Sequence, residues 1–291
     1  MSSIIPDVQF KNSELSRLGF EVVCLDNVYA QFEAKEIKYI DKPHRIHFYN
    51  IIIITDGQGV HSIDFNQFQI EKGRVLMINK GQIHAFDLVH KPKGKLIIFT
   101  DTFIDKVATA INLQIFSPTY FISSNLQGFT LSTRQESTLL ELISLLNIEL
   151  EIDTPNIEFL QTLFTSMLLK ITEARPNIYR NPMNPLQTRC FERFIGTLNE
   201  TFTQTRDAHY YAHLLGITYK TLNKICKLAT NRTAKQLIDA HTILEAKRRL
   251  SIDNYQIQQL AEYLGFDEPS NFVKYFKKHT LMTPSQFKKS R

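Results

Sequence analysis

The first part of the chain alternates short apolar runs with turn-forming residues, a pattern typical of β-structure. Apolar or alternating runs recur at Ile51–Ile54, Val60–Phe65, Val75–Ile78 and Leu96–Phe99. Glycine-bearing turns separate them, as in Asp56-Gly57-Gln58-Gly59 and Lys91-Pro92-Lys93-Gly94. Strands at this spacing with such turns predict a small barrel or sandwich over residues 1–125.

The apolar period then changes from that of strands to that of helices. Thr133 and Glu136 are spaced as a capping box that would open a first helix. Asp153-Thr154-Pro155 would open a second helix, because proline is tolerated in a first turn. Six apolar residues on these helices are candidate dimerisation residues: Leu139, Ile143, Leu146, Leu150, Leu163 and Met167. The pattern equally allows them to pack on the barrel or on each other, and both readings stay open.

A proline-bearing polar segment follows. Pro176, Pro182 and Pro185 disfavour both helix and strand there, and helical patterning resumes at Arg189. We therefore expect a β-rich domain at 1–125, a helical linker or dimerisation segment at 126–175, an interdomain linker at 176–186 and a helical domain at 187–291.

Composition places the chain among globular proteins. It has 291 residues, of which 43% are hydrophobic and 22% charged. No apolar run approaches the roughly 18 residues that span a membrane, and the first residues lack the pattern of a signal peptide. We expect a cytoplasmic protein without a membrane partner. Its three cysteines do not make a disulfide framework.

Charge is divided unevenly along the chain. Residues 187–291 carry 17 Lys and Arg against 9 Asp and Glu, a net charge of +8. Residues 1–186 carry 17 against 20, a net charge of −3. A basic C-terminal third indicates a polyanionic partner for that third.

The strongest pattern is an internal repeat in this basic third. Ala212-His213-Leu214-Leu215-Gly216 matches Ala261-Glu262-Tyr263-Leu264-Gly265 at an offset of 49 residues, and Leu222–Lys227 matches Phe272–Lys277 at an offset of 50. Each copy is typical of a helix, a turn at the glycine and a second helix, with Thr218 or Asp267 capping the second helix. A continuous helix over Ala234–Leu250 would join the copies.

The second helix of each copy alternates apolar positions with outward polar and basic ones. Leu222, Ile225 and Cys226 should face inward, as should Phe272, Tyr275 and Phe276. An α-helix fits the major groove of double-stranded DNA, where its first side chains reach base edges and flanking lysines meet phosphates. The candidate DNA-binding residues are Thr218, Tyr219, Lys220, Asn223, Lys224, Lys227, Glu268, Ser270, Asn271, Lys274, Lys277 and Lys278.

Residues 187–291 resemble the AraC/XylS family of transcription regulators. The similarity is carried by Ala246–Leu250, Leu260–Phe266, Asn271-Phe272, Phe276–His279 and Thr283–Phe287. The sequence departs at Met282, where the family usually has glycine, and at Cys226, where phenylalanine is commoner. The resemblance implies two helix-turn-helix units, an α+β fold, an activator in contact with RNA polymerase, a homodimer, and room for a small-molecule effector.

The N-terminal part resembles a cupin barrel. Gly73 followed by Asn79-Lys80-Gly81-Gln82-Ile83-His84 is similar to the second cupin motif, with Asn79 in place of proline. In metal cupins this histidine is a ligand, but His44 and His47 are three residues apart rather than two, and no matching glutamate follows. We therefore expect no metal and no cofactor. An effector would bind in the barrel, with candidate residues His47, Tyr49, Met77, His84 and Phe86.

Two other functions compete with this reading. A metal-dependent cupin enzyme with an accessory nucleic-acid-binding domain would need an intact set of metal ligands, which this motif lacks. A scaffold with a basic tail for RNA or acidic lipid would not need two glycine turns of one geometry. We expect a DNA-binding regulator and no enzyme.

Overall fold

The computed structural model describes residues 6–8, 18–107, 128–174, 183–252 and 256–290. These residues form two compact units, one reaching to Ala174 and the other starting at Met183. No described helix is long and apolar enough to cross a membrane.

The first unit contains all of the described strands, in two sheets. The strands are β1 (Asp7–Val8), β2 (Phe20–Cys24), β3 (His44–Ile46), β4 (Tyr49–Asp56), β5 (Gln58–Ile63), β6 (Asn66–Glu71), β7 (Arg74–Ile78), β8 (Ile83–Ala85), β9 (Lys93–Phe99) and β10 (Gly128–Thr130). One sheet has the order β1-β3-β8-β5-β6 and the other β10-β7-β4-β9-β2. All described pairs are antiparallel except β1 with β3. The α+β class is confirmed, with two sheets in place of one closed barrel.

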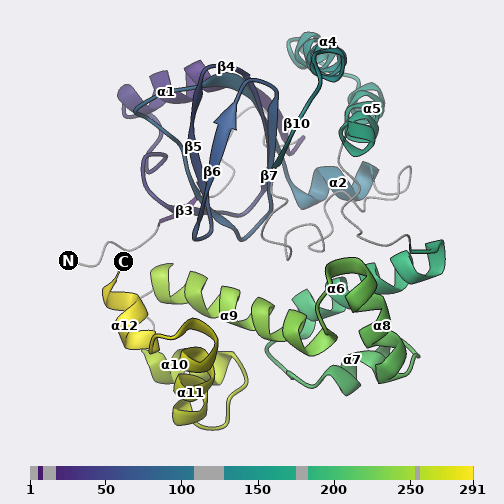
Figure 1. Cartoon of the computed structure of the whole chain (residues 1–291). Coiled ribbons are helices and arrows are strands. Elements are labelled where there is room, and N and C mark those ends of the chain that lie inside the picture. The colour runs from purple at the N-terminus through teal and green to yellow at the C-terminus, as the bar shows by residue number, and fades with distance from the viewer. Residues whose placement is uncertain (1–5, 9–17, 108–127, 175–182, 253–255, 291) are drawn as a thin grey trace. The chain divides into compact units, whose positions relative to one another are not determined.

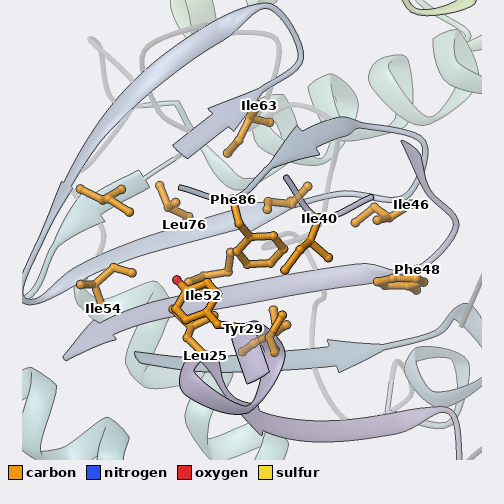
Figure 2. Close-up of a cluster of buried hydrophobic side chains, with 14 residues drawn as sticks. Leu25, Tyr29, Ile40, Ile46, Phe48, Ile52, Ile54, Ile63, Leu76 and Phe86 are labelled. Atoms are coloured by element: carbon orange, nitrogen blue, oxygen red, sulfur yellow. The ribbon is translucent and has the colours of Figure 1, made fainter. Parts of the chain in front are cut away.

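A single apolar core lies between these sheets. β3, β5 and β6 contribute Ile46, Ile63 and Ile70, and the other sheet contributes alternate residues such as Ile52 and Ile54. Figure 2 shows Phe86 among aliphatic side chains that come from both sheets. Helix α1 (Leu25–Glu33) adds its buried Leu25, Val28 and Tyr29 to the same core. β5 alternates buried residues with less buried ones, whereas β4 and β7 are buried at consecutive positions and read as continuous apolar runs.

The opposite face of the β4-containing sheet is covered by helices. Residues that alternate with the core set, such as Ile51, Ile53 and Met77, are also buried. Helix α2 (Asp101–Val107) and helix α5 (Ile157–Ala174) bring Phe103 and Phe164 against Phe20 and Phe99, with ring centroids 4.6–5.4 Å apart. Helix α4 (Thr133–Leu150) packs along α5, and Figure 1 shows the two as an adjacent pair.

Both helix starts differ in detail from the sequence prediction. The capping box of α4 is made by Ser132 and Gln135, one residue before the predicted Thr133 and Glu136. Helix α5 begins at Ile157, and the Asn156 side chain accepts a hydrogen bond from the Phe159 backbone N–H at 3.1 Å. Pro155 therefore lies outside the first turn, because Asn156, directly before Ile157, caps the helix.

The second unit is entirely helical. Its helices are α6 (Pro185–Thr201), α7 (Ala208–Leu214), α8 (Tyr219–Thr230), α9 (Ala234–Ile252), α10 (Ile257–Tyr263), α11 (Pro269–Thr280) and α12 (Pro284–Lys289). Figure 1 shows the long α9 between α6–α8 on one side and α10–α12 on the other. The predicted joining helix over Ala234–Leu250 is thus confirmed.

The start of the second unit corrects the predicted linker. Helix α6 begins at Pro185, four residues before Arg189, with Asn184 and Gln187 as its capping box. Proline stabilises this start because its missing N–H is not needed in a first turn. Residues 176–182 of the predicted linker lie outside the described residues.

Candidate nucleic-acid interface

The first helix-turn-helix unit consists of α7, a turn at Gly216, and α8. Gly216 has φ +69°, and the Ile217 N–H donates to the Ala212 carbonyl at 3.0 Å. This is the left-handed helix end predicted from the glycine. Thr218 then caps α8 by accepting a hydrogen bond from the Thr221 N–H at 3.1 Å. The chain reverses in a defined turn, which fixes the direction of α8.

The second helix-turn-helix unit repeats this geometry with a different cap. Gly265 also has φ +69°, and the Phe266 N–H donates to the Ala261 carbonyl at 2.9 Å. The residue at the start of α11 is Glu268, whose side chain makes no capping hydrogen bond, and Pro269 is the first helical residue. The prediction that Asp267 caps this helix is wrong: the helix starts one residue later, and a proline without an N–H occupies its first position.

The inward positions of both second helices are as predicted, with one partial exception. Leu222, Ile225 and Cys226 of α8 are buried, as are Phe272 and Phe276 of α11. Tyr275 is half-buried. Its hydroxyl donates to Asp239 Oδ1 of α9 at 2.7 Å, and burial together with that carboxylate raises the pKa of Tyr275.

Ten of the twelve candidate DNA-binding residues are exposed. They are Thr218, Lys220, Lys224 and Lys227 at α8, and Glu268, Ser270, Asn271, Lys274, Lys277 and Lys278 at α11. All six lysines in the two groups lie on the helices themselves, with their ammonium groups available to a polyanion. The two helices thus present matching basic faces.

The other two candidates, Tyr219 and Asn223, are half-buried. The Tyr219 ring stacks on His209 of α7, with centroids 4.2 Å apart. The Asn223 side-chain oxygen accepts a hydrogen bond from the Ala234 N–H at 2.9 Å. The prediction that Asn223 points outward is therefore corrected: its oxygen holds the start of α9 against α8.

The turn after α11 corrects one detail of the family resemblance. The residue with a left-handed backbone is Leu281, with φ +64°, and its N–H donates to the Lys277 carbonyl at 2.9 Å. Met282, where the family usually has glycine, is the next residue and does not have a positive φ. The corresponding end of α8 uses Asn231 at φ +61°. Asparagine tolerates this conformation better than leucine does.

The candidate effector residues do not lie together. His84 and Phe86 face the core between the sheets. Met77 pairs with Ile51 and Tyr49 with Phe99, so both belong to the opposite face of that sheet, where the Tyr49 hydroxyl donates to Asp101. His47 is half-buried just after β3. The prediction of one pocket failed because strand alternation sends neighbouring residues to opposite faces.

Three histidines meet inside the first unit, and the sequence analysis had not included His61. The rings of His44 and His61 lie 4.4 Å and 5.3 Å from that of His84, all beside Phe86. His61 Nε2 and His84 Nδ1 are 3.1 Å apart and share a hydrogen bond. Burial lowers the pKa of all three and brings that of His61 to about 3. Within the described ranges, no group of three His, Cys, Asp or Glu side chains is arranged to hold a metal ion.

The candidate dimerisation residues are mostly interior. Leu139, Ile143, Leu146, Leu163 and Met167 are all buried. Leu150 is half-buried. They form the packed side of α4 and α5, which agrees with the packing alternative that the sequence left open. The exposed apolar residues of this region are others, among them Leu145, Ile148 and Ile152.

Two parts of the chain match known protein families. Residues 211–290 match the family described as a helix-turn-helix domain. Residues 31–93 match the family described as an AraC-like ligand binding domain. The first match covers both turns and both recognition helices, and the second runs from the end of α1 to the first residue of β9.

Similar proteins of known role extend over most of the chain. The transcriptional activator RhaR of Mannheimia succiniciproducens is 23% identical, covering 84% of this chain and 86% of that protein. The activator RhaS of Pectobacterium atrosepticum is 21% identical, covering 84% and 87%. Among solved structures, ToxT of Vibrio cholerae aligns over 92% of this chain and 97% of its own, with a TM-score of 0.44 and 15% identity.

Proposed function

The chain is a transcriptional regulator of the AraC family, and from this premise we propose that it recognises a DNA sequence through α8 and α11. The observation that carries the proposal is the repeat of one geometry. Both helices follow a glycine turn at φ +69° and both present exposed lysines. A surface that only attracts polyanions does not need two such turns.

Each helix would enter a major groove with its first residues leading. Lys220 on α8, and Ser270, Asn271 and Lys274 on α11, are exposed in the first half of their helices and are the candidates for base edges. Lys227, Lys277 and Lys278 lie near the helix ends and are the candidates for phosphates. Successive major grooves on one face of DNA are about 34 Å apart, and α9 connects the two units.

We propose that the regulator is an activator that contacts RNA polymerase. Its relatives RhaR and RhaS are named as activators. An effector would bind the first unit, whose residues 31–93 match a ligand binding domain. The buried His44, His61 and His84 would offer imidazole nitrogens to such a molecule, since His84 Nε2 has no partner among the described residues. A DNA-bound regulator of this kind acts in the cytoplasm.

We propose that the active form is a homodimer. Leu145, Ile148 and Ile152 leave an apolar stripe exposed on and just beyond α4, at helical spacing. A second copy is the occupant that fits, because a two-fold axis lets one stripe cover the same stripe of its partner. The stripe lies within residues 126–175, the segment that the sequence predicts as a helical linker or dimerisation segment.

We propose no enzymatic role. A metal-dependent cupin enzyme needs several side chains that direct their ligand atoms to one metal ion. His61 and His84 instead use one ring nitrogen each in the hydrogen bond between them. The relatives are named as regulators of transcription, not as enzymes.

The test is selection of DNA by the full chain. Fragments of the source genome are bound over a salt series, and the retained fragments are sequenced. We expect a few promoter-proximal sequences to be enriched, with affinity that falls steeply as salt rises. Lys80→Ala is the matched control for Lys274→Ala. Both lysines are exposed, but Lys80 lies in the β-rich unit and not on a recognition helix. Uniform retention of all fragments would contradict sequence recognition and leave only electrostatic binding.

A further inference from the structure

The loop between α6 and α7 makes a contact with the turn of the second helix-turn-helix unit. Arg206 Nη1 donates to the Leu264 carbonyl at 2.5 Å, and Nη2 donates to the Gly265 carbonyl at 2.8 Å. The guanidinium carbon also lies 3.7 Å from the centroid of the Phe266 ring. One side chain, from the loop that precedes the first helix-turn-helix unit, thereby contacts three consecutive residues of the turn between α10 and α11.

The same loop approaches the turn through its backbone. A Cβ placed on Gly265 would lie 2.1 Å from the Thr203 carbonyl oxygen, far inside contact distance. Gly216, at the matching position of the first helix-turn-helix unit, has no heavy atom of the described residues within 4 Å of such a Cβ. Both glycines have φ +69°, so this backbone angle does not distinguish them, whereas the contact with the loop does. The missing side chain at Gly265 thus leaves room for the Thr203 carbonyl, and Gly216 makes no such contact with the described residues.

The contact leads directly to the second recognition helix. Phe266 packs on Phe272 and Tyr275 of α11, with ring centroids 5.4 Å and 5.2 Å away. The loop is itself held to the first helix-turn-helix unit, because the buried Tyr211 of α7 donates its hydroxyl to the Thr205 carbonyl at 3.2 Å. A continuous set of contacts thus runs from α7 through Arg206 to α11.

We propose that Arg206 is a positioning residue that sets the spacing and angle between the two recognition helices. This inference rests on the proposed function, since it concerns how two DNA-reading units act on one site. Helix α9 joins the two helix-turn-helix units along the chain. The Arg206 contact adds a connection through space, beside the packing of the Phe202 ring on Tyr263 of α10. A rigid pair binds both DNA segments at once, and it rejects segments at the wrong spacing.

The chemistry of the contact separates positioning from phosphate binding. Lysine keeps the positive charge but has neither the planar fork for two carbonyls nor the flat face for Phe266. Arg206→Lys should therefore disrupt positioning and preserve a purely electrostatic contact. Gly265→Ala disturbs the same contact from its other side, and Gly216→Ala is its control for backbone strain.

The experiment uses the full chain and a duplex that the wild type selects from a random library. Its affinity is compared with that for duplexes in which one of the two recognised segments is scrambled, and for duplexes with one base pair inserted between the segments. Far-UV circular dichroism establishes that each variant is folded. We expect Arg206→Lys and Gly265→Ala to lose about tenfold or more on the intact duplex. On single-segment duplexes they should match the wild type, and they should discriminate less against the insertion.

Several results would overturn the inference. Wild-type affinity and spacing preference in Arg206→Lys would show that the contact does not position the helices. Equal losses on intact and single-segment duplexes would assign Arg206 to general stability or to a direct DNA contact. Equal losses in Gly216→Ala would attribute the glycine effect to strain alone. If the wild type selects no sequence, the proposed function itself fails, which is a distinct outcome.

Discussion

Leu281 ends the second recognition helix, α11, in a backbone conformation that leucine rarely adopts. Its φ is +64°, and its side chain is 87% exposed. A left-handed conformation costs an L-residue with a side chain roughly 1–2 kcal/mol. Because the side chain makes little contact, replacing it removes almost no buried apolar surface. Leu281→Gly is therefore predicted to stabilise the helical unit.

The expected size follows from two opposing effects. Glycine relieves the strain of about 1–2 kcal/mol in the folded chain. It also gives the unfolded chain more freedom, which costs about 0.4–1 kcal/mol. From the middle of the two ranges, about 1.5 and about 0.7 kcal/mol, the net gain in the free energy of unfolding is about 0.8 kcal/mol. In a unit of this size, such a gain raises the midpoint of thermal unfolding by roughly 2–8 °C.

Urea unfolding of the full chain, followed by far-UV circular dichroism, measures this change. Amide hydrogen exchange of peptides from α11 assigns it to the right helix. Asn231→Gly is the matched control, because it ends α8 at φ +61° with a residue that tolerates the conformation. We expect the control to change stability by less than about 0.5 kcal/mol. A Leu281→Gly chain no more stable than the wild type, or no more changed than the control, would refute the strain argument.

Three further predictions concern the DNA interface, the histidines and the dimer. Lys274→Ala should cost about 1–3 kcal/mol of binding at one position of the selected sequence if Lys274 reads a base, measured by fluorescence anisotropy on single-base variants; an even loss over all sequences would make it a phosphate contact. Burial lowers the pKa of His61 to about 3, so the unfolded chain binds more protons as pH falls below about 6.5. Stability that is fully present at pH 7 should fall by about 2 kcal/mol at pH 5 for this residue, and His61→Leu should flatten the decline seen in urea titrations. Ile148→Glu, on the exposed side of α4, should give a folded monomer by light scattering, whereas Leu146→Glu should unfold the first unit; a dimeric Ile148→Glu would contradict the proposed stripe.

The repeat in the C-terminal third was readable from the sequence because its signals are local. A glycine at a helix end and the apolar spacing of the following helix depend only on neighbouring residues, so Gly216, Gly265 and the buried Phe272 were predicted correctly. Helix starts were less exact, since several residues near Ser132 and Glu268 are acceptable caps and packing selects among them.

Contacts between residues far apart in the chain could not be predicted from local sequence patterns. Whether Tyr49 and Phe86 share a face depends on the register of strands far apart in the chain. The approach of His61 to His84 depends on the pairing of β5 with β8. Arg206 gave no signal in the sequence, because its partners lie 58 and 59 residues away. Such contacts come from topology, which local patterns do not specify.

The most direct test of the central claim is a hydroxyl-radical footprint of the full chain on a fragment that it selects. The account predicts two protected segments on one face of the DNA, with centres about one helical turn, roughly 10 base pairs, apart for each bound chain. Lys274→Ala should weaken the segment read by α11 and leave the other protected. A single protected segment per chain, or protection without sequence preference, would contradict recognition by two units.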